Sequence, residues 1–146
     1  KINTMFSTGH LHPMMVHFPI ALLLLGFVFE ICSLLFKKET CWSFAGFWLL
    51  IAGTLGALAA FGSGLLFTSE LTGTAGKIKE IHEILAGMTV LCALVDSGLK
   101  IYLKLSHKEN DTLKWISFGF YALSAILVII TGFYGGNLVY TYMLPL

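Results

Sequence analysis

Residues Ile20–Phe36 read IALLLLGFVFEICSLLF and contain one charged side chain among seventeen residues. A run of this length and polarity suits a helix that crosses a bilayer, which needs about 20 mainly apolar residues. The ten residues before it, His10–Pro19, read HLHPMMVHFP and hold three of the five histidines and two of the three prolines. The stretch therefore predicts a membrane-spanning helix with imidazoles concentrated at its start.

The composition of the chain indicates an integral membrane protein. Its 146 residues are 57% hydrophobic and 12% charged, with a mean hydropathy of +0.85, whereas about 25% of residues are charged in a typical soluble domain. The net charge of +1 gives no electrostatic basis for binding nucleic acid. We expect no cleavable signal peptide, because KINTMFSTG is too polar and the first apolar run is longer than an h-region.

Three further apolar runs follow the first, so we predict an all-α fold, a polytopic membrane four-helix bundle that forms a single domain over residues 1–146. Pro19 lies inside the first run. Because it has no N–H, it should disturb the helix near the carbonyl of Met15. The expected spans cover about residues 13–36, 44–67, 78–105 and 115–140.

The lysines predict the orientation of the bundle. Six of them lie near the loops FKKETCW and LKLSHKENDTLKW, and three, Lys1, Lys77 and Lys79, lie toward the other side. Cytoplasmic loops carry an excess of positive residues. We therefore expect both termini, and the histidine-rich stretch, on the periplasmic side.

Two histidines are expected to meet inside the bundle. His17 and His82 each lie about one turn inside the start of a span, and these spans run in the same direction, so both imidazoles reach the same depth. Such a pair can supply the two axial nitrogens of a b-type haem. His12 lies five residues before His17, about 140° around a helix, so we expect it at the rim of the site. Zinc held by these three histidines and a carboxylate remains an alternative.

Small residues are concentrated at the same end of the neighbouring spans, where a flat porphyrin needs space. They recur at every fourth position toward the end of span two and cluster near the end of span four. Small residues also let membrane helices pack closely, so plain packing remains open as an explanation. The further residues expected at the haem site are Gly64, Gly132, Gly135, Gly136 and Asn137, with His12, Lys77, Lys79 and Asn137 available to the propionates.

Two acidic residues, Glu30 in span one and Asp96 in span three, fall inside the apolar runs. Carboxylates within a membrane are costly and are functional candidates, so a proton path is one interpretation. Structural pairing is the other, because Asp96 precedes Lys100 by four residues, the spacing of an ion pair on one helix face. Both interpretations remain open from the sequence.

The stretch Leu11–Leu22, LHPMMVHFPIAL, resembles the L-H-P-x-x-V-H-F-P-I-A-L opening of a four-helix bacterial membrane family, domain of unknown function 2231. The resemblance continues in the small-residue end of span two at 62–68, in His82, and in the TG-x-x-GG-x-L-V-Y end of span four at 131–140. It therefore covers essentially the whole chain. Some similar proteins are fused to c-type cytochrome or Rieske-like modules, which implies electron transfer in the bacterial inner (cytoplasmic) membrane.

These observations predict a membrane b-type cytochrome, or the haem-bearing subunit of a respiratory redox complex, with His17 and His82 as iron ligands. The haem b would be non-covalent, because the chain has no C-x-x-C-H motif. Electrons would pass between a periplasmic partner such as cytochrome c and quinone or another haem. We expect an electron-transfer subunit with membrane or periplasmic redox partners and no nucleic acid, rather than a stand-alone enzyme. The alternatives are a non-catalytic structural or assembly subunit, and a transporter or proton-coupled enzyme that uses Glu30 and Asp96.

Overall fold

The computed structural model describes residues 11–36, 38–68, 71–106 and 110–142. Within these ranges the chain contains helices and no strands, and four stretches, the first of them made of two helices in succession, are long and apolar enough to cross a membrane. The predicted all-α membrane bundle of four spans is confirmed. The helices are α1 (Leu11–Met15), α2 (His17–Leu35), α3 (Thr40–Phe67), α4 (Gly73–Ser106) and α5 (Asp111–Tyr142).

The helices α3, α4 and α5 each begin four or five residues before the predicted spans. Apolarity predicts only the membrane-spanning part of each helix, whereas helical hydrogen bonding continues into the polar residues that flank it. Asn110 supports the start of α5, since its side-chain Oδ1 accepts a hydrogen bond of 3.0 Å from the Leu113 N–H. Gly73 begins α4 with a φ of +68°, a backbone conformation that glycine adopts without strain.

The first span is interrupted at Val16, between α1 and α2. Pro19 has no N–H to donate to the carbonyl four residues earlier, which belongs to Met15. The next hydrogen bond, from the Ile20 N–H to the Val16 carbonyl, is long at 3.5 Å. Val16 itself keeps helical angles, so α1 and α2 continue together as one span. The disturbance expected from Pro19 is therefore observed.

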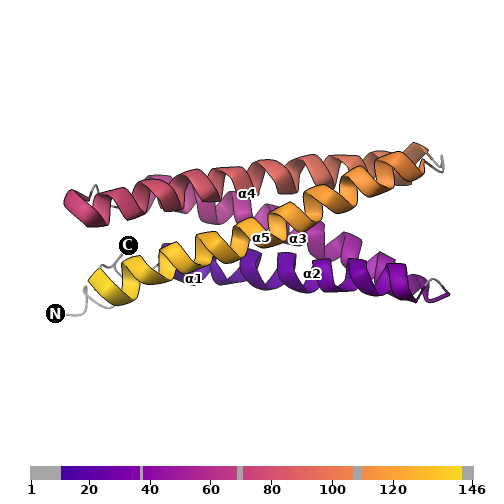
Figure 1. Cartoon of the computed structure of the whole chain (residues 1–146), viewed down its shortest axis with the longest axis horizontal. Coiled ribbons are helices and arrows are strands. Elements are labelled where there is room, and N and C mark those ends of the chain that lie inside the picture. The colour runs from indigo at the N-terminus through magenta and orange to yellow at the C-terminus, as the bar shows by residue number, and fades with distance from the viewer. Residues whose placement is uncertain (1–10, 37, 69–70, 107–109, 143–146) are drawn as a thin grey trace.

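Successive long helices run antiparallel (Figure 1), and the contacts between them close the bundle into a ring. In this ring α2 packs along α3 and α4 packs along α5, while contacts of α3 with α4 and of α2 with α5 complete it. The α1–α2 span and α4 therefore run in the same direction and oppose each other across the diagonal. The starts of α1 and α4 and the ends of α3 and α5 meet at one end of the bundle (Figure 1).

The core lies at the middle of the bundle and draws on all four spans. Glycines bring the helices close there: a Cβ added to Gly53 of α3 would lie 2.9 Å from the Leu23 side chain of α2. A Cβ added to Gly26 would collide with the hydroxyl of Tyr121 and lie 2.9 Å from the Cβ of Leu49. The central cluster of buried side chains contains Leu23, Leu50, Ala93, Tyr121 and Val128.

Replacing Gly26 with alanine should destabilise the bundle by about 1–3 kcal/mol, the usual cost of overpacking a filled core. Gly119→Ala is the matched control, because nothing lies within 4 Å of a Cβ added there. That control should leave stability unchanged or raise it by up to about 1 kcal/mol through helix propensity. The thermal unfolding midpoint in detergent, followed by circular dichroism, measures both. Equal midpoints for the two variants would contradict the close packing at Gly26.

Candidate functional site

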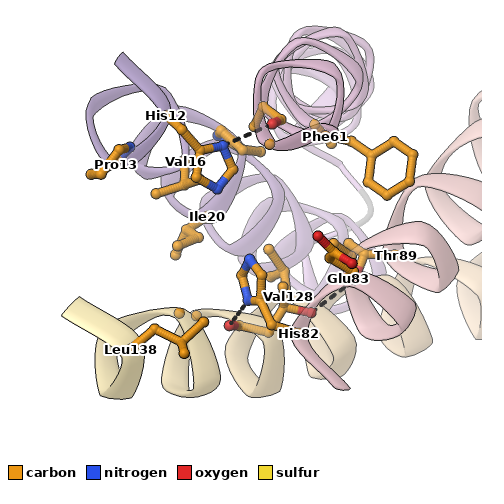
Figure 2. A pocket seen from close by; sticks show the side chains of 18 of the residues that line it. His12, Pro13, Val16, Ile20, Phe61, His82, Glu83, Thr89, Val128 and Leu138 are labelled. Atoms are coloured by element: carbon orange, nitrogen blue, oxygen red, sulfur yellow. Dashed lines mark hydrogen bonds between the residues drawn. The ribbon is translucent and has the colours of Figure 1, made fainter. Parts of the chain in front are cut away.

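His12 of α1 and His82 of α4 face each other near one end of the bundle (Figure 2). Their ring centroids lie 6.3 Å apart and the ring planes are nearly perpendicular, at 85°. His12 is buried, with 6% of its surface exposed, and His82 is half-buried. The pair therefore joins the two spans that oppose each other across the diagonal.

Each imidazole is held through its Nδ1 by the helix beside it. The Nδ1 of His12 lies 3.0 Å from the Ala60 carbonyl oxygen and 2.9 Å from the Ser63 hydroxyl, both on α3. The Nδ1 of His82 lies 3.0 Å from the Thr131 carbonyl oxygen on α5. A carbonyl oxygen only accepts, so each Nδ1 carries the hydrogen, and in the neutral ring each Nε2 then keeps a free lone pair. Figure 2 shows these second nitrogens directed into the space between the rings.

Two glycines give the imidazoles the room that these hydrogen bonds require. A Cβ added to Gly64 would lie 3.0 Å from the Cε1 of His12, and one added to Gly135 would lie 2.9 Å from the Cε1 of His82. Either side chain would push its imidazole away from the carbonyl that holds it. The neighbouring Gly136 has nothing within 4 Å of an added Cβ. Of these two adjacent glycines, only Gly135 is needed to make room for His82.

A cavity of about 220 Å³ surrounds the histidine pair, and its lining is mainly apolar (Figure 2). Glu83 borders it and forms an ion pair of 3.0 Å with Lys79, one turn earlier on α4. Thr89 also borders it and shares a hydrogen bond of 3.4 Å with the hydroxyl of Thr131. The apolar lining includes Val16, Ile20, Phe61, Val128 and Leu138.

The prediction that His17 faces His82, with His12 at the rim, is wrong in its geometry. His17 borders the cavity but is exposed, and its Nδ1 donates a hydrogen bond of 2.7 Å to the Pro13 carbonyl. The separation of the two faces by about 140° was correct, but the inward face is that of His12. The buried positions that follow His12 along this span are Pro19, Leu23 and Gly26.

Hydropathy could not reveal this face, because both sides of a membrane helix are apolar. The signal that could have revealed it is the glycine at position 26. Gly26 lies fourteen residues after His12, about four helical turns, and a glycine on that face indicates close approach to another helix.

The structure distributes the other predicted residues as follows. Gly64, Gly132, Gly135, Gly136 and Lys79 border the cavity. Asn137 does not border it, and its side chain accepts a hydrogen bond from the Thr141 hydroxyl instead.

Lys77 is exposed and borders a separate surface hollow. His10 and His107 lie outside the described residues. The carbonyls that hold the histidines could not be predicted from the sequence, since a carbonyl oxygen is common to every residue.

The fold and this site define a four-helix membrane protein with a histidine pair near one end of its bundle. A family model described as a predicted membrane protein, DUF2231, matches residues 9–145. The chain belongs to this family, which confirms the resemblance seen in its opening motif. No curated protein and no solved structure matches the chain.

The different burial of the two N-terminal histidines can be tested by chemical modification. Diethyl pyrocarbonate should acylate exposed His17 much faster than buried His12, because an imidazole must be accessible to react. Peptide mass spectrometry of the detergent-solubilised protein over time gives both rates within one sample. Equal rates at the two residues would contradict the placement of His12 inside the bundle.

Proposed function

We propose that the protein is a membrane b-type cytochrome, or the haem-bearing subunit of a larger redox complex, in which His12 and His82 would hold the haem iron. The observation that carries this proposal is the pair of facing imidazoles, each with Nδ1 tied to a backbone carbonyl. Histidines that ligate a metal characteristically donate their other ring N–H in this way, which fixes the tautomer and the ring orientation.

The spacing of the two rings supports the same proposal. Two metal–nitrogen bonds of about 2 Å each, with roughly 1 Å from each nitrogen to its ring centre, separate the centres of two opposed imidazoles by about 6 Å. The observed separation is 6.3 Å. The agreement of these two separations supports a metal ion held between the two rings.

The donor set favours haem over zinc. A porphyrin supplies four nitrogens of its own, so two protein ligands complete the iron, whereas zinc takes three or four protein ligands. In the part of the chain that the structure describes, no three histidine, cysteine or acidic side chains are grouped so as to hold a metal ion.

Haem, when bound, supplies a one-electron couple. The residues of the chain would determine the orientation of its ligands and the polarity of its surroundings. The carbonyls of Ala60 and Thr131 hold both imidazoles with Nε2 free to ligate, and a hydrogen bond to Nδ1 makes the ligand more basic. The mainly apolar lining lowers the local dielectric, which is one way in which a protein tunes a haem potential.

The size of the cavity supports a role as a subunit. At about 220 Å³ it is smaller than the roughly 300–1,000 Å³ of typical small-molecule sites, so a haem would extend beyond this chain and meet lipid or a partner. We propose a respiratory complex of the bacterial inner membrane, with the histidine end on the periplasmic side, as the lysine distribution favours. Its partners would be a periplasmic donor or acceptor such as cytochrome c, and quinone or a second haem.

An absorption spectrum of the purified protein, before and after dithionite, tests the proposal directly. We expect a Soret band, with sharp α and β bands on reduction. His12→Ala and His82→Ala should each abolish these bands, because each removes an axial ligand. His17→Ala is the matched control and should keep them.

Two results would contradict this assignment. Loss of the bands in His17→Ala and His82→Ala, with His12→Ala unaffected, would support the ligand pair expected from the sequence instead. A protein that stays colourless after incubation with haemin would favour the structural or assembly subunit instead.

Gly135→Ala should weaken haem binding by about tenfold or more, which corresponds to about 1.4 kcal/mol. The added methyl group would displace His82 from the Thr131 carbonyl. Gly136→Ala, one residue further on, should bind haem as the wild type does, since no atom lies within 4 Å of its added Cβ. Titration of the apoprotein with haemin gives both affinities. An equal loss of haem affinity in the two variants would contradict the dependence of His82 on the space at Gly135.

A further inference from the structure

A second cluster of polar side chains lies in the half of the bundle away from the histidines. Asp96 of α4 is completely buried, and its Oδ1 accepts a hydrogen bond from the Ser117 hydroxyl of α5. Its other oxygen, Oδ2, has no hydrogen-bond partner. Within the described residues, the only other buried side-chain nitrogen or oxygen in this condition is the hydroxyl of Tyr121, also on α5.

One lysine lies within reach of two carboxyl groups in this cluster and pairs with one of them. Lys100 of α4 forms an ion pair of 2.6 Å with Glu30 of α2, across the diagonal of the bundle, and each side chain is only 14% exposed. Asp96 lies four residues before Lys100, so it is the other acid within reach of the ammonium group. The pairing of Asp96 with Lys100 that the sequence allowed is not the one observed.

The charges in this cluster do not balance if both acids are ionised. Glu30 and Lys100 neutralise each other, which leaves Asp96 as an uncompensated charge in the interior of a membrane domain, where such a charge is strongly unfavourable. The charged groups that act on Asp96 are Lys100 and Glu30 themselves. The neighbouring helices bring hydroxyl groups instead: Tyr121 from α5, and Thr54 from α3, which bonds to Ser97 at 2.9 Å.

A proton fits this cluster better than a metal ion does. Metal cations of the alkaline-earth type take about six or more oxygen ligands, whereas the cluster offers two buried oxygens without a partner. A proton needs only one oxygen to bind. It also removes the unbalanced charge completely.

We propose that Asp96 and Glu30 form a proton-binding site that holds one exchangeable proton between them, with Lys100 as their shared counter-ion. In the observed arrangement Glu30 holds Lys100, and the proton is on Asp96. When Lys100 turns to Asp96, an O–H bond at Asp96 breaks and one at Glu30 forms, so Asp96 becomes the carboxylate and Glu30 the neutral acid. The net charge of the cluster is the same in both arrangements.

This exchange would move a proton between a fully buried acid and one that is partly exposed. Tyr121 is placed to assist, because its ring lies 5.7 Å from the Lys100 ammonium and its hydroxyl has no partner. Such a hydroxyl can accept a hydrogen bond from one group while it donates to another. The site is separate from the histidine pair and adds proton transfer to the functions of the membrane domain.

Infrared spectroscopy of the full chain at neutral pH tests the proposal, because a protonated carboxyl group absorbs separately from a carboxylate. The wild type should show one such band that shifts in D₂O. Asp96→Asn should lose it, since Glu30 stays paired with Lys100. Glu30→Gln should lose it too, because Asp96 then becomes the counter-ion of Lys100. Lys100→Met should roughly double the band, as both acids become neutral in the absence of a cation.

Glu80→Gln is the matched control, since Glu80 is exposed, and it should keep the wild-type band. No band in the wild type, or a band that persists in Asp96→Asn, would overturn the assignment of the proton to Asp96. A band that persists in Glu30→Gln would overturn the exchange through Lys100.

Circular dichroism and gel filtration show which variants fold, and if Asp96→Asn does not, Glu30→Gln and Lys100→Met decide the question. None of these substitutions changes a residue that borders the histidine cavity, so the outcome is independent of whether the protein binds haem.

Discussion

Polar groups inside a membrane domain are shielded from water and are costly unless they find a partner within the protein, and this constraint organises the bundle. The Oδ2 of Asp96 and the hydroxyl of Tyr121 are the exceptions among the described residues. The histidines meet this constraint through the carbonyls of Ala60 and Thr131. Glu30 meets it through Lys100. The histidine hydrogen bonds join adjacent helices, α1 to α3 and α4 to α5, whereas the Glu30–Lys100 ion pair joins α2 to α4 across the diagonal.

Glycines leave the space that these polar side chains need inside the bundle. Gly64 and Gly135 leave room for the two imidazoles against the backbones of α3 and α5, and Gly26 leaves room for the hydroxyl of Tyr121. The small residues at the ends of α3 and α5 therefore do more than pack helices together, because they decide where the histidine rings lie. Other glycines, such as Gly136, have free space beside them and carry no such requirement.

The sequence by itself determined the architecture of this protein. Four apolar runs of sufficient length predict four membrane helices, since backbone polar groups in lipid must be satisfied within each segment. The break near Val16 followed from the missing N–H of Pro19. The alternating direction of successive spans also places His82, Gly64 and Gly135 at the same end of the bundle, because it fixes which residues lie at the same depth.

Only the tertiary structure decided which residues within these helices meet. Whether His12 or His17 faces inward depends on the rotation of the first span, and a helix that is apolar on all sides carries no hydropathy signal for its rotation. Lys100 likewise pairs with Glu30 because α2 approaches α4 across the bundle. The spacing of Asp96 and Lys100 along α4 would by itself have favoured an ion pair between those two residues. Both outcomes result from contacts between residues far apart in the chain, so they were fixed by helix packing and not by hydropathy or by the spacing of charges on one helix.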